Sequence, residues 1–239
     1  MNIALVFAGG TGQRMNTATK PKQFLELHGK PILIYTLEHF QYHPQIDAIV
    51  LVCLKDYIQY SRDLVKRFAI TKVQKIVPGG HNGQQSIFNG LKVAFEQYGG
   101  DNIVLIHDGV RPLINEKIIT DSINMVIEKG NAITVSPAIE TVVMKNPNNT
   151  LGAVLERSDC YIAKAPQSFW LRDIYDTHLM NISTVNKTFI DSASLMQYYG
   201  HTLYTVYSSF ENIKITTPSD YYIFRAIMDA RENLQIIGL

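Results

Sequence analysis

The chain has 239 residues, of which 46% are hydrophobic and 18% are charged, and its formal net charge is +1. This is the composition of a folded globular protein and not of a disordered one. No strong basic field and no acidic tail are present, so we expect no nucleic-acid partner.

The two cysteines, Cys53 and Cys160, lack the spacing of a disulfide framework or a zinc site. The chain begins with "MNIALVFAGG", which has no basic segment and whose apolar run ends at Gly9, so no signal peptide is expected. No apolar run is long enough to span a bilayer. We therefore expect a cytoplasmic protein with no membrane partner.

Short apolar runs alternate with amphipathic segments over most of the chain. The predicted strands are Ile3–Phe7, Ala48–Leu54, Lys72–Val77, Asn102–His107 and Ala132–Ser136. Their Ile and Val residues form continuous runs, which is typical of strands covered on both faces. The segments between them, 31–43, 57–69, 86–98 and 115–129, carry apolar residues at helical spacing. This alternation predicts one large α/β domain with a mainly parallel sheet, whose sites lie at the carboxyl ends of the strands.

The alternation stops between about residues 140 and 170. Two extended segments, "ETVVMK" and "LGAVLERS", flank the turn sequence "NPNNT". This pattern predicts a β-hairpin arm, which either packs on another subunit or lies on the surface of a monomer. A helical segment beginning at Phe169 follows. The last helix is expected to begin at Pro218, with Thr217 and Asp220 as its capping residues.

A glycine loop, "AGGTGQRM", follows the first predicted strand. It is neither a dinucleotide fingerprint, because Met15 stands where a third small residue belongs, nor a P-loop, because no Gly-Lys-Ser/Thr closes it. Backbone N–H groups in such a turn can bind phosphate oxygens. Arg14, Lys20 and Lys22 follow, and they repel one another unless an anion lies among them. The alternative is a solvated cluster of surface cations.

The sequence "HDGVRP" places Asp108 at the carboxyl end of a predicted buried strand, with Arg111 shortly after it. A carboxylate that faces a phosphate loop is a typical Mg²⁺ ligand, because Mg²⁺ takes one or two carboxylates together with substrate phosphates. In the alternative interpretation Asp108 caps a turn and pairs with Arg111. We expect His107 to pack or to form a hydrogen bond, and not to bind a metal.

Two further segments allow both a functional and a structural interpretation. In "PGGHNGQQS" the glycines lead into a helix, and Ser86 either bonds a ribose or supports the helix start. In "ENIKITTPSD" Lys214 stands in a predicted short strand. Lys214 either reaches a phosphate or protects a sheet edge.

These motifs, together with "QSIFNGL", "APQSF" and "DSASLMQYYG", occur in an order that resembles the CTP-dependent sugar-alcohol-phosphate cytidylyltransferases from end to end. The resemblance implies a Rossmann-like three-layer nucleotidyltransferase fold over residues 1–239, with the arm joining a homodimer. It implies transfer of CMP from CTP to an alditol phosphate with Mg²⁺. "AGGTG" and Val110 favour D-ribitol 5-phosphate as the acceptor, whereas "DSASL" favours 2-C-methyl-D-erythritol 4-phosphate. A nucleotide-binding regulatory module without turnover is the alternative from another class.

The resemblance also implies roles for individual residues. The expected catalytic residues are Arg14, Lys22, Arg157 and Lys214. The expected CTP-binding residues are Phe7, Ala8, Gly9, Gly10, Gly80, His81, Ser86 and Gly109. The acceptor is expected to contact Arg111, Thr141, Arg157 and Lys214, with Thr141 and Arg157 reaching the partner's site, and Asp108 is expected to bind Mg²⁺. One departure is that "HNGQQS" lacks the arginine that this family commonly carries before the serine.

Overall fold

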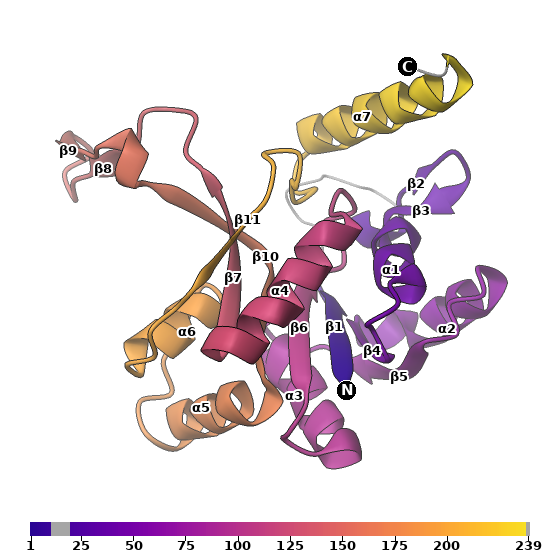
Figure 1. Cartoon of the computed structure of the whole chain (residues 1–239), viewed down its shortest axis with the longest axis horizontal. Helices are drawn as coiled ribbons and strands as arrows, with labels where there is room; N and C mark the ends of the chain where they lie inside the picture. The colour runs from indigo at the N-terminus through magenta and orange to yellow at the C-terminus, as the bar shows by residue number, and fades with distance from the viewer. Residues whose placement is uncertain (11–19, 238–239) are drawn as a thin grey trace.

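The computed structural model describes residues 1–10 and 20–237, and its centre is a seven-stranded sheet with the strand order β11-β7-β10-β6-β1-β4-β5 (Figure 1). The strands are β1 (Asn2–Ala8), β4 (Ala48–Cys53), β5 (Val73–Pro78), β6 (Ile103–Asp108), β7 (Asn131–Pro137), β10 (Tyr161–Trp170) and β11 (Thr205–Tyr207). Only β10 runs antiparallel to its neighbours β6 and β7. The predicted, mainly parallel sheet is therefore confirmed, with the five predicted strands at β1, β4, β5, β6 and β7.

Helices cover both faces of the sheet because its central strands are apolar on both faces. In β1, Ala4 and Val6 pack on one face against α1 (Ile32–Tyr42), α2 (Ile58–Arg67) and α4 (Glu116–Lys129). Ile3 and Leu5 pack on the other face against α3 (Gly83–Tyr98), α5 (Leu171–Ser183) and α6 (Ser192–Tyr198). This alternation, two residues per repeat along the strand, gives the predicted three layers. None of the helices in the described ranges is long and apolar enough to cross a membrane.

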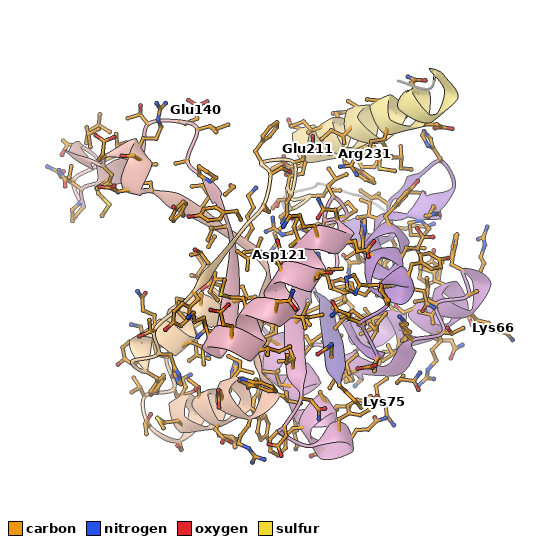
Figure 2. All side chains as sticks on the ribbon, viewed as in Figure 1. Lys66, Lys75, Asp121, Glu140, Glu211 and Arg231 are labelled. Carbon is orange, nitrogen blue, oxygen red and sulfur yellow. The ribbon has the colours of Figure 1, made fainter. Side chains whose placement is uncertain are left out.

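The carboxyl end of the sheet has a small core of its own. Phe224 of α7 (Pro218–Ile237) is fully buried there against Ile32, Val110 and Ile215. The predicted cap at Thr217 is present, since its hydroxyl accepts from the Asp220 N–H at 3.4 Å. In addition, the Asp220 carboxylate accepts from the Thr216 and Thr217 N–H groups at 2.8 and 2.7 Å. An exposed ion pair between Glu211 and Arg231, 2.8 Å long, joins α7 to the segment before it (Figure 2).

The predicted arm is present but shorter than expected. Strands β8 (Val143–Lys145) and β9 (Leu151–Val154) form a two-stranded hairpin that projects from the body (upper left in Figure 1). Residues 161–170, which were predicted to belong to the arm, instead form β10 in the middle of the main sheet. The prediction failed because β10 contains a lysine, a proline and a glutamine, and its register with β7 shifts between Ala163 and Gln167. Its sequence therefore shows no strand-like apolar run.

Candidate active site

Two cavities open side by side at the carboxyl end of the sheet. The first, the glycine-loop cavity, has a volume of about 590 Å³ and is lined by Phe7–Gly10, Lys22, Gly80–Gly83, Ser86 and Thr216, among others. The second, the β10 cavity, has a volume of about 420 Å³ and is lined by Arg111, Ala163–Ala165, Gln167, His178 and Asp191, among others. The two cavities share Phe7, Gly83, Asp108 and Lys214 as a common wall.

The glycine-loop cavity is formed by two turns that pack closely on each other. A Cβ on Gly9 would lie 3.2 Å from Ser86 Oγ, so this approach favours a glycine. Ser86 is buried, and its hydroxyl accepts from the Gly80 N–H at 3.0 Å and donates to the Asn82 carbonyl at 2.8 Å. Asn82, and not Ser86, caps α3. Ser86 therefore shapes the loop at the helix start while it lines the cavity.

Apart from Gly109, every residue predicted to bind CTP lines the glycine-loop cavity. Gly109 lies beneath the loop, where its N–H donates to the Phe7 carbonyl at 2.9 Å. A Cβ on Gly109 would come within 2.8 Å of Ala8 Cβ. Gly109 is therefore a packing position below the loop and not part of the cavity wall.

The segment "KPKQF" turns back onto the glycine loop through a short 3-10 helix, Lys22–Phe24. Lys22 is 9% exposed, and its ammonium donates to the Ile215 carbonyl at 2.9 Å. The Gln23 amide donates to the Ala8 and Gly10 carbonyls at 2.7 and 3.3 Å, a contact that the sequence did not predict. Lys20 is exposed and pairs with Glu26 at 3.7 Å. Arg14 lies outside the described residues.

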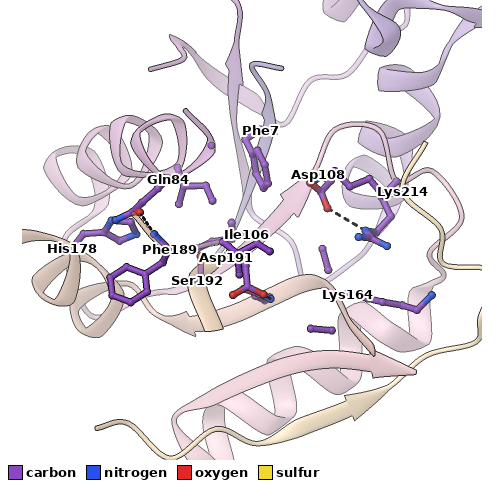
Figure 3. A pocket seen from close by; sticks show the side chains of 17 residues that line it. Phe7, Gln84, Ile106, Asp108, Lys164, His178, Phe189, Asp191, Ser192 and Lys214 are labelled. Carbon is purple, nitrogen blue, oxygen red and sulfur yellow. Dashed lines mark hydrogen bonds and ion pairs between the residues drawn. The ribbon is translucent and has the colours of Figure 1, made fainter. Parts of the chain in front are cut away.

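Asp108 lies at the centre of the common wall, at the end of β6. Its carboxylate is 6% exposed and forms ion pairs with Arg111 Nε at 3.2 Å and with Lys214 Nζ at 2.6 Å (Figure 3). Burial alone would raise the pKa of Asp108, but the charges of Arg111 and Lys214 outweigh burial and lower the pKa to about 2. Asp108 is therefore ionised at neutral pH. Its pair with Arg111 is the one that the alternative interpretation of the sequence predicted, whereas its pair with Lys214 was not predicted.

Asp108 is the residue of the common wall that could bind a divalent cation. No group of three or more His, Cys, Asp or Glu side chains in the described part of the chain is arranged to hold a metal ion. Asp108 nevertheless fits Mg²⁺, which needs only one or two carboxylates when substrate phosphates and water supply the other oxygens. Because Lys214 pairs with Oδ1 of Asp108 and Arg111 pairs with Oδ2, Mg²⁺ would share the carboxylate with these cations or displace one of them.

Lys214 reaches Asp108 from residues 212–216, a segment that we call the strap. The strap is irregular, so the short strand predicted around Lys214 is wrong. The Ile215 N–H donates to the Val110 carbonyl at 2.8 Å, which holds the strap across the end of the sheet. Asn212 is buried, and its backbone carbonyl accepts from Arg111 Nη1 at 2.8 Å and from Lys164 Nζ at 3.0 Å.

The β10 cavity contains only part of the predicted acceptor site. Arg111 and Lys214 line it, whereas Thr141 and Arg157 are exposed on the arm and line neither cavity of their own chain. Lys164 also lines the β10 cavity, and burial, with the nearby Arg111, lowers its pKa to about 8. No sequence motif indicated Lys164, because its place depends on how β10 enters the sheet.

Two buried histidines near the site are structural in character. His107 Nε2 lies 3.1 Å from the Arg111 carbonyl, and the ring packs edge-on against Phe40, as the prediction of packing or hydrogen bonding requires. Burial lowers the pKa of His107 to about 3 and that of His178 to about 4. Both imidazoles are therefore neutral at physiological pH.

The geometry suits the joining of two anionic ligands. One cavity offers backbone groups of glycine turns, the other offers cationic side chains, and Asp108 and Lys214 line both. Ligands that fill both cavities would bring their near ends together at this wall. Such an arrangement favours transfer between phosphate groups, because the main barrier there is the repulsion of two anions.

The comparisons with known proteins agree with this arrangement. Residues 2–230 match the family described as IspD, 2-C-methyl-D-erythritol 4-phosphate cytidylyltransferase. The chain is 52% identical to a ribitol-5-phosphate cytidylyltransferase of Streptococcus agalactiae serotype III (strain NEM316), over 100% of both chains. It is 37% identical to a 2-C-methyl-D-erythritol 4-phosphate cytidylyltransferase of Clostridium botulinum (strain Loch Maree / Type A3), over 95% of this chain and 97% of that one.

A solved structure extends the likeness to the fold. The 4-diphosphocytidyl-2C-methyl-D-erythritol synthase of Anaerococcus prevotii DSM 20548 superimposes with a TM-score of 0.82 at 26% identity, covering 95% of this chain and 96% of that one. The family match spans nearly the whole sequence and includes the lining residues of both cavities. The chain therefore belongs to the IspD family of cytidylyltransferases and is a nucleotidyltransferase.

Proposed function

We propose that this enzyme transfers CMP from CTP to D-ribitol 5-phosphate with Mg²⁺, giving CDP-ribitol and pyrophosphate. The main support for a transfer reaction is that two neighbouring cavities share one wall, which contains the ion pair of Asp108 and Lys214. The choice of ribitol phosphate is supported by the full-length identity of 52% to a relative of that name. The alternative acceptor, 2-C-methyl-D-erythritol 4-phosphate, has support from a relative at 37% identity.

CTP would occupy the glycine-loop cavity. Its triphosphate would lie against the backbone of Phe7–Gly10, with Lys22 and Arg14 offsetting its charge. Its ribose and base would lie near Gly80, His81 and Ser86. Because the arginine common in this loop is absent, base recognition would depend on backbone groups and on the side chains of the "HNGQQS" segment.

The acceptor would enter the β10 cavity with its phosphate next to Arg111 and Lys214. A phosphate monoester has a second pKa of about 6, so it is largely a dianion at neutral pH and needs no general base. One of its oxygens would attack the α-phosphorus of CTP, and the bond from that phosphorus to the β-phosphate oxygen would break. Pyrophosphate would leave with the electron pair, and the nearby cations would offset the developing charge.

Mg²⁺ would be held by Asp108 together with phosphate oxygens of the nucleotide. When bound, it would neutralise charge on the phosphates. Asp108 also balances Arg111 and Lys214, whose positions next to the acceptor phosphate depend on their pairing with this carboxylate.

The polyol part of the acceptor would contact polar groups deeper in the β10 cavity. Gln167 and Asp191, joined by a hydrogen bond of 2.9 Å, line it, as does the buried Ser192, whose hydroxyl has no hydrogen-bond partner among the described residues. An unbranched pentitol chain offers several hydroxyls to such groups. A site built to bond hydroxyls strongly rejects an analogue that lacks them.

The arm supports the homodimer that we propose as the working form. Its hairpin exposes Val143, Leu151 and Val154 by 41%, 74% and 66%. A lone two-stranded hairpin is at best marginally stable, so a second copy would cover this apolar surface. Thr141 and Arg157, which line neither cavity of their own chain, would then reach the partner's acceptor.

We also propose a cytoplasmic location, since Cys53 and Cys160 are both free thiols.

A side-by-side assay tests this function. Pyrophosphate release is measured with CTP and Mg²⁺ and with each alditol phosphate in turn. We expect a higher kcat/KM for D-ribitol 5-phosphate. A higher kcat/KM for 2-C-methyl-D-erythritol 4-phosphate would overturn the choice of acceptor alone. Binding of CTP without turnover of either acceptor would favour the regulatory module.

A further inference from the structure

Lys164 connects β10, an interior strand of the sheet, to the segment that carries Lys214. Its side chain lines the β10 cavity on the same side as Asp108 and Lys214 (Figure 3). Its ammonium donates to two backbone carbonyls, those of Phe210 at 3.2 Å and Asn212 at 3.0 Å. Two of its three N–H groups are therefore engaged with residues 210–212.

Asn212, at the beginning of the strap, is fixed from several directions. Arg111 Nη1 donates to the same Asn212 carbonyl at 2.8 Å, so two cations share one acceptor. The Asn212 side-chain amide donates to the Ala165 carbonyl at 2.9 Å, next to Lys164 on β10. Asn212 is fully buried, so these bonds form away from competing water.

Lys214 lies two residues after Asn212 in the strap, and its side chain extends to Asp108. The Lys214 side chain is 41% exposed, and its ammonium is held by the 2.6 Å ion pair with Asp108 and by a longer contact with the Phe7 ring, 5.9 Å from the ring centre. The position of its ammonium also depends on where the strap backbone is held. After Lys214 the strap is held at Ile215 by its bonds with Val110 and Lys22, and before Lys214 it is held at Asn212 by Arg111 and Lys164. Hydrogen bonds from a charged donor are about twice as strong as neutral ones, so Lys164 is one of two charged anchors on the side before Lys214.

We propose that Lys164 is a positioning residue for cytidylyl transfer: by anchoring the strap at Phe210 and Asn212, it fixes Lys214 next to Asp108 and the reacting phosphates. The inference rests on the proposed function, because it assigns Lys214 to those phosphates. A competing role, in which Lys164 binds the acceptor directly, differs in its kinetics: it would change the KM for the acceptor and leave the strap unaffected.

The test compares Lys164→Met, which keeps the apolar stem, with Lys164→Arg, which keeps the charge and the donors. Lys75→Met is the matched control, since Lys75 is an exposed strand lysine at the opposite edge of the sheet (Figure 2). We expect Lys164→Met to lower kcat by about tenfold, because small displacements of a charged group are costly in the transition state. Lys164→Arg should recover most of kcat, and Lys75→Met should match the wild type.

Hydrogen–deuterium exchange of residues 208–216, measured without substrates, separates this inference from the proposed function. In Lys164→Met we expect faster exchange of this segment, with a thermal midpoint that shows a folded chain. Exchange and kcat equal to those of the wild type would overturn the inference, and so would a raised acceptor KM with unchanged kcat. If the wild-type chain released no pyrophosphate from CTP with either acceptor, the proposed function would fail, while the exchange data would still decide the anchoring.

Discussion

The glycine-loop cavity and the β10 cavity meet at Asp108 but are built differently. The first is made of short contiguous segments, Phe7–Gly10 and Gly80–Gly83, that present mainly backbone groups. The second brings together Arg111, Lys164 and Lys214, which are far apart in the sequence, and presents charged side chains. The nucleotide side therefore depends on close backbone packing, whereas the acceptor side depends on charge balance and on long-range anchoring.

Asp108→Asn probes the wall that both cavities share. The amide keeps the shape but leaves Arg111 and Lys214 without their counter-charge, and it is a poor ligand for Mg²⁺. We expect turnover to fall by roughly a thousandfold. The assay is pyrophosphate release, with a thermal scan to confirm folding. The control is Asp121→Asn, since Asp121 is partly exposed on α4, pairs with Lys117 and lines neither cavity. A near-normal rate at ordinary Mg²⁺ levels would mean that Asp108 only holds the turn.

Lys22→Ala and Arg14→Ala test the cations on the nucleotide side. Each is expected to lower kcat by about tenfold or more, because each variant loses one charged contact with the transferring phosphates. Lys20→Ala is the control, since Lys20 is two residues from Lys22 but exposed and paired with Glu26. Equal rates for the Lys20 and Lys22 variants would remove Lys22 from the mechanism.

Mixed dimers test whether the acceptor side is completed by a second chain. Arg157→Ala and Lys22→Ala chains, each with its activity lowered when assayed alone, are unfolded and refolded together. Random pairing would restore about a quarter of the sites, because half of the dimers are mixed and each mixed dimer has one intact site. A mixture no more active than its components would place Arg157 in its own chain's site or outside the chemistry.

Gly9→Ala and Gly10→Ala sharpen the view that the nucleotide side works through backbone packing. A Cβ on Gly9 meets Ser86 Oγ at 3.2 Å, whereas a Cβ on Gly10 meets nothing within 4 Å among the described residues. We expect Gly9→Ala to raise the KM for CTP by roughly fivefold, in proportion to about 1 kcal/mol of lost binding. Gly10→Ala should change the KM for CTP less than Gly9→Ala does. The KM for the acceptor should stay constant in both variants. The opposite order of effects would contradict the packing seen at Gly9.

Acid affects stability through two buried imidazoles, His178 on the β10 cavity and His107, which packs against Phe40. The lowered pKa values of His107 and His178, about 3 and 4, mean that the unfolded chain binds protons that the folded chain does not. Stability should therefore fall as the pH drops below about 6.5, by about 1.4 kcal/mol per pH unit for each imidazole. Urea unfolding from pH 7.5 to 4.5 measures this slope, and His178→Phe should reduce it. An unchanged slope in that variant would contradict a buried, neutral His178.

The glycine-loop cavity could be predicted from the sequence, whereas most of the β10 cavity could not. The apolar runs of β1 and β6 and the helical spacing between them gave the sheet, and contiguous motifs gave the glycine loop and Asp108. β10 was missed because a central strand with Lys164, Pro166 and Gln167 has no periodic apolar pattern. Its contacts with the strap were missed with it, since Lys164 and Asn212 are 48 residues apart and meet only through the fold.

A crystal structure with CDP-ribitol bound tests the central claim most directly. We expect cytosine beside Gly80–Ser86, the ribitol chain in the β10 cavity near Gln167, and the bridging diphosphate at Lys214 and Asp108. A product whose ribitol end lies outside the β10 cavity, or whose diphosphate lies away from this shared wall, would contradict it.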